Sequence, residues 1–133
     1  MHSFYIKVAA YMGALSVAIG AFAAHQLKAV ATAEVLQIFE TAVRYQFYHV
    51  FALLATGILL QTYQNKQLKW AANSFIAGIV LFSGSLYVLC VIKHFNPMEK
   101  PWIGAVTPLG GVCFIAGWLL LAIGLANKSK PLS

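Results

Sequence analysis

The chain has 133 residues, of which 61% are hydrophobic and 9% are charged. Because so few polar side chains cannot coat a water-soluble globule, the composition excludes a soluble domain and predicts a single integral membrane domain over residues 1–133. The formal net charge of +6 does not indicate nucleic-acid binding, because the lysines fall at the edges of apolar runs, where they reach lipid headgroups.

The first predicted membrane helix covers residues 4–26, which carry no charge after Lys7 and are rich in alanine and glycine. Lys7, the apolar run and the AFA triplet at 21–23 also fit a cleaved secretory signal, which is the alternative for this segment. The spacing of the small residues favours a helix packed in a bundle.

Three further membrane helices follow, at residues 34–63, 70–92 and 102–126. Thr32 is a suitable N-cap for the second helix, and Trp70 is a typical interfacial anchor for the third. The predicted fold is therefore all-α, a polytopic membrane protein with a bundle of four transmembrane helices.

Four crossings place both termini on the side of the second loop. This side collects the lysines Lys7, Lys66, Lys69, Lys128 and Lys130, and the other side has Lys28, Lys93 and Lys100. The positive-inside rule then predicts cytoplasmic termini in the cell membrane.

Small residues recur every seven positions and predict faces where helices approach closely. The pairs and triplet are Gly13 with Gly20, Gly78 with Ser85, and Gly110 with Gly117 and Gly124. The two cysteines, Cys90 and Cys113, lie inside apolar runs and are predicted to be core residues rather than a disulfide.

The second helix carries most of the ionisable groups of the apolar region. Glu40, Arg44 and Tyr48 are spaced four apart and share one helical face, and Tyr45 and His49 form a neighbouring line. Because charged side chains inside a membrane need partners, this face is predicted to point toward the other helices.

Polar residues of the other helices are predicted to lie at a similar depth. They are His25 at the end of the first helix, Ser83, Ser85 and Tyr87 in the third, and Thr107 in the fourth. Pro108 follows Thr107 and is expected to kink or open the fourth helix, so that freed carbonyls face the same cluster.

Two main interpretations of this cluster remain open. In the first, the charged and polar groups satisfy one another, and Glu40 with Arg44 stabilises a structural or accessory membrane component, alone, as a homo-oligomer or in a larger complex. In the second, the cluster is a polar half-cavity that binds or transports a small anionic solute or a lipid headgroup through Arg44, as an oligomer. Proton movement or chemistry through Glu40, His25 and His49 is a third alternative.

Enzymatic and metal-binding signatures are missing from the sequence. The acids are Glu34, Glu40 and Glu99, which offer no paired-carboxylate arrangement, and the sequence has no phosphate-binding glycine loop. His25 and His49 differ too much in estimated depth to share one coordination sphere. We therefore expect no enzymatic activity, no metal and no cofactor.

Four segments together resemble a family of small membrane proteins typified by YgdD and YwdK. They are GAFAAHQLK at 20–28, ETAVRYQFYHVFALL at 40–54, LFSGSLYVL at 81–89 and TPLGGVCFIAGWLLLA at 107–122. The resemblance implies a four-helix protein of the bacterial cytoplasmic membrane, and it implies no established activity, because the family is classed as a domain of unknown function. The family's pattern falls on the polar cluster, on Pro108 and on Gly110.

Overall fold

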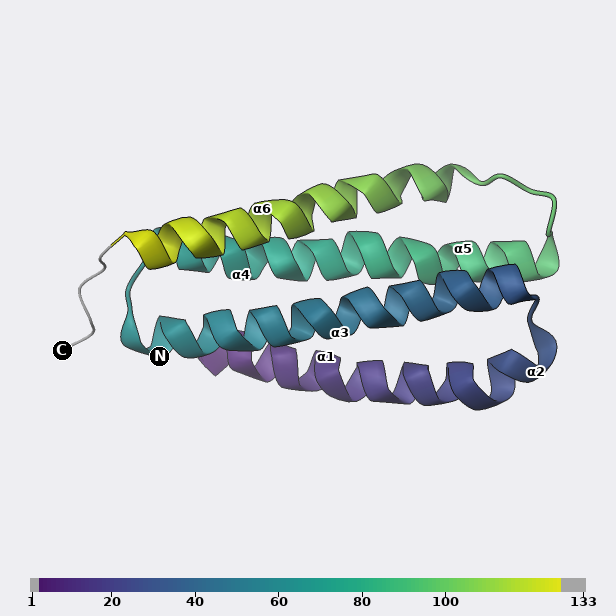
Figure 1. Cartoon of the computed structure of the whole chain (residues 1–133), viewed down its shortest axis with the longest axis horizontal. Helices are drawn as coiled ribbons and strands as arrows, with labels where there is room; N and C mark the ends of the chain where they lie inside the picture. Colours follow the sequence, from purple (N-terminus) through teal and green to yellow (C-terminus); the bar gives the residue numbers. More distant parts are fainter. Residues whose placement is uncertain (1–2, 128–133) are drawn as a thin grey trace.

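The computed structural model describes residues 3–127, and four long helical stretches run side by side within them (Figure 1). They cover Ser3–Val30, Ala33–Thr62, Lys66–Phe95 and Trp102–Ala126. Each stretch is long and apolar enough to cross a membrane. The predicted fold class, an all-α bundle of four transmembrane helices, is confirmed.

Irregular turns interrupt three of the four stretches. In chain order the elements are α1 (Ser3–Phe22), η1 (Ala23–Leu27), α2 (Lys28–Val30), α3 (Ala33–Thr62), α4 (Lys66–Gly78), η2 (Ile79–Ser83), α5 (Gly84–Phe95), η3 (Trp102–Ala105) and α6 (Val106–Ala126). The segments η1 and η2 are π-helical, and η3 is a 3₁₀-helix. Single π-helical turns inside α-helices are uncommon and occur often at functional sites.

Side-chain caps set the start of two helices. The Thr32 hydroxyl accepts a hydrogen bond from the Val35 amide at 3.2 Å, as predicted for an N-cap of α3. The Asn65 side chain accepts from the amides of Gln67 and Leu68 at 2.8 and 3.3 Å. Because Asn65 caps it, the third stretch begins at Lys66 and not at residue 70, where its uncharged run starts.

Pro108 lies in the first turn of α6 and causes no break there. A residue in the first turn has no amide partner within its helix, so the missing proline N–H costs little at this position. The irregular backbone lies earlier, in η3. The predicted opening of the helix is thus displaced to its entrance, before Thr107.

The bundle is built from two helix pairs joined along α3. α1 packs mainly on α3, α6 packs mainly on α4 and η2, and α3 contacts α4, η2 and α5 (Figure 1). α1 begins and α6 ends at the end of the bundle where α3 connects to α4 (Figure 1). An even number of crossings produces this arrangement.

Two apolar clusters fill the interior at different heights. The larger one includes Leu53, Leu60 and Phe75, and the smaller one lies nearer the α2–α3 connection and includes Val35 and Phe39. On α3, the buried polar residues Gln46 and His49 lie between the parts that enter these two clusters. The fold therefore places a polar layer inside an otherwise apolar bundle.

The predicted glycine face of α6 is a close helix contact. The glycines of this face, spaced seven residues apart, are Gly110, Gly117 and Gly124, and all three are buried. A Cβ atom added at Gly117 would lie 2.6 Å from the buried Phe75 ring. Only a residue without a side chain allows α4 and α6 to approach this closely.

Candidate functional site

Helix α3 has two opposite faces, and their roles differ from the prediction. Ala42, Gln46 and His49 are buried, whereas Glu40 and Arg44 are exposed. Because an α-helix has 3.6 residues per turn, Ala42 lies roughly 200° around the helix from Glu40. The prediction that Glu40 and Arg44 point into the bundle is wrong.

The apolar residues of α3 decide which face is buried. Val35, Ala42, Val50 and Leu53 are all less than 5% exposed and form one stripe along the helix. Turning Glu40 inward would move this entire stripe toward lipid. The helix keeps its apolar stripe inside and carries its charged residues outside.

Two more predicted site residues belong to the outer surface. His25 lies in η1 and is exposed, and Tyr48 is 54% exposed. Within residues 3–127, neither the Glu40 side chain nor the Arg44 side chain forms an ion pair or a hydrogen bond. The ion pair found in this part of the chain instead joins Lys93 Nζ to Glu34 Oε1 at 2.7 Å, and ties the end of α5 to the start of α3.

Gln46 is the centre of the buried polar layer. The Tyr87 hydroxyl donates to Gln46 Oε1 at 2.6 Å, and Gln46 Nε2 donates to the carbonyl of Met12 at 3.4 Å. The Gln46 side chain, 1% exposed, therefore links α5 to α1 through α3. Burying this amide is tolerable because its donor and its acceptor are both used.

Two serines of the third stretch, Ser83 and Ser85, form hydrogen bonds in opposite directions. Ser83 Oγ donates to the Ala42 carbonyl of α3 at 2.8 Å. Ser85 Oγ lies 2.6 Å from Thr107 Oγ1 at the start of α6, and it also donates to the Phe82 carbonyl at 2.9 Å. The residues around η2 thus fasten both neighbouring helices to the third stretch.

His49 is held on both ring nitrogens. Trp118 Nε1 donates to His49 Nε2 at 3.1 Å, and His49 Nδ1 lies 2.7 Å from the Tyr45 carbonyl. Since Nε2 accepts, this network assigns the proton of the neutral ring to Nδ1, which donates to the carbonyl. The His49 ring also stacks on Phe114, with centroids 3.5 Å apart, so it acts as a packed part of the core.

Tyr45 lies at the border between the two faces of α3. Its side chain is 37% exposed, and its ring stacks on Phe82 with a centroid distance of 4.7 Å. The predicted cluster is therefore divided. Tyr87, His49, Ser83, Ser85 and Thr107 belong to the inner hydrogen-bonded layer, and His25, Glu40, Arg44 and Tyr48 belong to the outer surface.

A groove of about 360 Å³ opens between α1 and α3 beside the outer charges. It is lined by Gly20, Ala23, Ala24, Glu40, Val43 and Arg44. The residues of α1 and η1 that line the groove are small, so they leave space beside the two charged side chains. Tyr87, Ser83, Ser85 and Thr107 do not line it, so the predicted half-cavity is not a single space.

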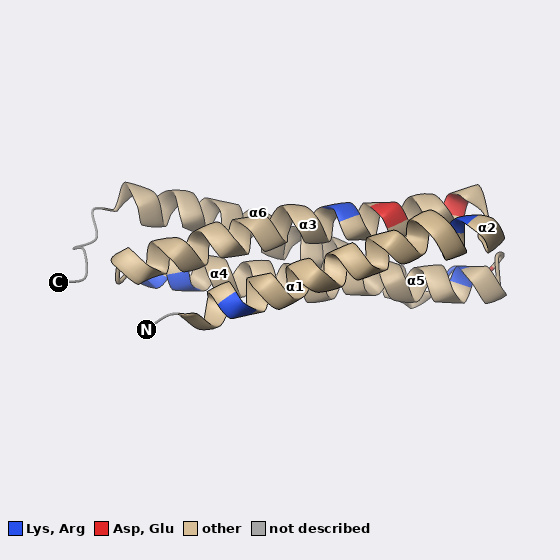
Figure 2. Cartoon of the chain, turned by 90° about the horizontal axis from the view of Figure 1, so that it is seen from below, with Lys and Arg blue, Asp and Glu red and all other residues tan. Residues whose placement is uncertain are grey.

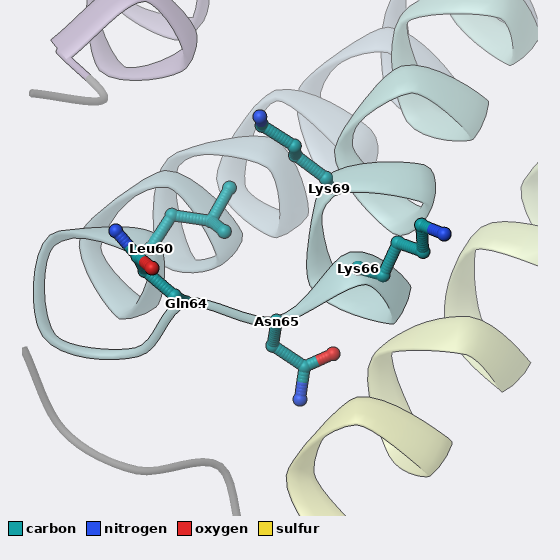
Figure 3. Close-up of a pocket in the computed structure, with 5 residues that line it drawn as sticks. All are labelled: Leu60, Gln64, Asn65, Lys66 and Lys69. Carbon is teal, nitrogen blue, oxygen red and sulfur yellow. The ribbon is translucent and has the colours of Figure 1, made fainter.

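A second pocket, of about 380 Å³, lies at the far end of α3, where the chain turns into α4 (Figure 3). It is lined by Leu60, Gln64, Asn65, Lys66 and Lys69. Figure 3 shows Lys69 extending toward the side of Leu60 and Lys66 extending away from it. The two amines therefore do not converge on one position.

Comparisons with known proteins place the chain in a family. A family model described as "Protein of unknown function (DUF423)" matches residues 19–111. A UPF0382 membrane protein of Staphylococcus saprophyticus is 43% identical over 123 residues, which cover 90% of this chain and 97% of the relative. The chain belongs to the DUF423 family.

Other relatives agree with this assignment. A UPF0382 membrane protein of Haemophilus influenzae is 40% identical to this DUF423 protein over 132 residues, covering 99% of the chain and all of the relative. The UPF0382 inner membrane protein YgdD of Escherichia coli is 37% identical over 127 residues, covering 96% and 92%. No solved structure matches the chain significantly. The predicted family, typified by YgdD and YwdK, is confirmed, and it is a family of unknown function.

Within residues 3–127 of this DUF423 protein, no three His, Cys, Asp or Glu side chains lie close enough together to hold a metal ion. Cys90 is buried and donates to the Val35 carbonyl at 3.5 Å. Cys113 is a free, partly buried cysteine. Cys90 is therefore a core residue, as predicted, whereas Cys113 is not in either core cluster and lines a pocket with Trp70 and Asn73.

Gln46 and Trp118 are functional-site neighbours that the predicted residue set omits. Gln46 stands between Tyr45 and Phe47 in the sequence, and its value as a buried donor and acceptor becomes visible only once the buried face of α3 is known. Trp118 stands in an apolar run, where a tryptophan gives no sign of a polar contact. A count of the polar atoms that need partners on the buried face would have found Gln46.

Proposed function

We propose that this protein is a structural or accessory component of the cell membrane, and that it is not an enzyme. The proposal rests on one observation: among residues 3–127, every buried side-chain nitrogen and oxygen has a hydrogen-bond partner within the protein. A catalytic or ligand-binding interior normally keeps polar groups free for the substrate. Here the inner polar layer is used to join the four helices.

The alternative is binding or transport of a small anionic solute or a lipid headgroup in a polar half-cavity. This function needs a cation and free donors around one space. In this structure Arg44 faces outward, and the polar groups near it in depth are bonded to one another. The structural function therefore accounts for more of the polar residues.

The Gln46–Tyr87 hydrogen bond tests the structural function. We expect Tyr87→Phe to lower the free energy of unfolding by about 0.6–1.7 kcal/mol, from the average to the largest value found by double-mutant cycles for hydrogen bonds between membrane helices. The reason is that Gln46 Oε1 would be buried without a donor. Thermal unfolding in detergent, followed by circular dichroism and size-exclusion chromatography, measures the change.

The double variant Gln46→Leu with Tyr87→Phe is the decisive comparison. It removes both polar partners, so its stability should recover to near that of the native protein. Tyr48→Phe is the matched control, since that hydroxyl lies on the exposed face and should change little. Tyr87→Phe with native stability would contradict a structural role for this layer, and a double variant less stable than either single variant would show that the two side chains are not each other's partners.

We also propose that the protein lies in the cytoplasmic membrane with both termini in the cytoplasm. Two facts support this location. The Escherichia coli relative is named an inner membrane protein, and the order of the spans in the sequence assigns five lysines to the side of the termini against three to the other side. Two of the five, Lys128 and Lys130, lie outside the described residues. An alkaline phosphatase fused to the C-terminus should be inactive in a bacterial host, and the same enzyme inserted after Pro97 should be active; the reverse pattern would refute this orientation.

A further inference from the structure

Glu40 and Arg44 are charged side chains on the outside of a membrane-spanning helix. Figure 2 shows the setting: charged residues gather near the ends of the bundle, and α3 carries a blue and a red residue set further in from its end. Helix α3 has 30 residues and is therefore about 45 Å long, against a hydrocarbon core of about 30 Å. With the helix centred in the bilayer, the backbone of Arg44 lies about 9 Å inside the hydrocarbon.

Such charges call for partners. Ionisable groups within membrane spans almost always face a protein interior or pair with an opposite charge. Within residues 3–127 neither side chain has a hydrogen bond or an ion pair. An ion pair formed between Glu40 and Arg44 of one chain would use two of the five guanidinium donors and would still face acyl chains.

We propose that the groove lined by Gly20, Ala23, Ala24, Glu40 and Arg44 is a dimer interface, and that its occupant is a second copy of this chain. The two copies pack in parallel about a two-fold axis along the membrane normal. In a two-fold interface each surface meets itself, so Arg44 of each copy reaches Glu40 of the other. Each guanidinium then lies between two carboxylates, and the four charges close into a neutral ring removed from lipid.

The composition of the groove selects this occupant. It contains one acid and one base, so it is self-complementary. An anionic lipid phosphate would satisfy Arg44, but Glu40 is only one helical turn away and would repel it. The small residues Gly20, Ala23 and Ala24 permit close approach of another helix, as in many contacts between membrane helices.

Charge reversal on mixed copies tests the dimer. Two fluorescent fusions of the full chain would be expressed together in a bacterial membrane, and energy transfer between them would be measured. Glu40→Arg expressed with itself and Arg44→Glu expressed with itself should each lose the energy transfer, because like charges then meet. Glu40→Arg expressed with Arg44→Glu should restore it, because the two surfaces are again complementary.

The loop between α5 and η3 offers a matched control. Glu99→Arg and Lys100→Glu are the same reversals at exposed positions outside the groove, and they should leave the energy transfer unchanged. If a reversal prevents folding, the uncharged double variant Glu40→Leu with Arg44→Leu replaces it, and this variant should also lose the energy transfer, because leucine offers neither a charge nor a hydrogen bond.

Three results would overturn the proposal. The first is energy transfer at the native level in either reversed variant alone or in the uncharged double variant. The second is failure of the mixed pair to recover when both members are folded. The third is a native mass spectrum of the protein released from its membrane that shows only the 14.5 kDa chain with a bound anionic phospholipid, lost on Arg44→Glu.

Discussion

We expect Gly110→Ala to lower the free energy of unfolding by about 3 kcal/mol, the upper end of the usual cost of overpacking. A Cβ atom at Gly110 would lie 2.3 Å from the backbone nitrogen of Phe82 and 2.6 Å from its Cα. Because these are backbone atoms in η2, no side-chain rotation relieves the clash. Helix α6 would have to move away from the third stretch and would strain the Ser85–Thr107 hydrogen bond.

The neighbouring glycine is a close control for this result. A Cβ at Gly111 would come only within 4.0 Å of the Phe82 ring, so Gly111→Ala should be tolerated. Both variants change one helical glycine to alanine in the same turn, so helix propensity does not separate them. Thermal unfolding of the two purified proteins measures the difference, and equal melting temperatures would show that the α6–η2 contact is looser than described.

Phe114→Ala should be nearly as damaging, at about 3 kcal/mol, the lower end of the range for deletion of a buried phenylalanine ring. The Phe114 ring is 4% exposed, stacks on His49 and contacts Phe82 with centroids 5.4 Å apart. Its loss leaves a void at the junction of α3, η2 and α6. The exposed neighbour Ile115 is the control, and Ile115→Ala should have a much smaller effect on the melting temperature.

A substitution at Gly78 tests whether Phe114→Ala leaves a void at the position that the structure predicts. A Cβ at Gly78 would lie 2.3 Å from the Phe114 ring, so Gly78→Ala alone should destabilise the protein. In the Phe114→Ala background the same methyl group should enter the vacated space and cause no further loss. A double-mutant cycle with simple additivity of the two losses would contradict direct contact between these residues.

The membrane spans could be predicted from hydropathy because each apolar run is bounded by lysine or by loop residues. The ends of the spans were harder to place. The third stretch begins at Lys66, because Asn65 caps it there, and it therefore includes charged residues that precede the uncharged run. The length of the uncharged run underestimates the length of the helix. The π-helical turns η1 and η2 left no recognisable sequence signal, since Ala, Leu, Ile and Val suit a regular helix equally well.

The sequence predicted which polar residues lie in the membrane spans, but it did not predict the orientation of α3. The rule that membrane charges face inward predicts one rotation of α3, and the apolar stripe through Val35, Ala42, Val50 and Leu53 requires the opposite one. Burying that stripe involves many more contacts than hiding one ion pair, so the stripe sets the rotation of the helix. In the proposed dimer, the rule that membrane charges need partners is satisfied between the two copies rather than within one chain.

Hydrogen-bond partners could be predicted only where two residues lie at the same depth in consecutive helices. Ser85 and Thr107 lie near the ends of consecutive helices, and their contact agrees with the expected clustering at one depth. The contact of Trp118 with His49 depends on how α6 is rotated against α3, which no local pattern specifies. The contacts of Gln46 also depend on the rotation of α3, because Gln46 lies on the buried face, opposite the charged residues that the sequence predicts to face inward.

Intramolecular cross-linking tests the orientation of α3 most directly. In a background of Cys90→Ser and Cys113→Ser, Ala42→Cys combined with Ser83→Cys should form a disulfide within one chain in the native membrane, because Ser83 Oγ lies 2.8 Å from the Ala42 carbonyl. Glu40→Cys combined with Ser83→Cys should form none, since residue 40 lies on the far side of the helix. A disulfide between positions 40 and 83, with none between 42 and 83, would show that the charged face points inward and would contradict the account.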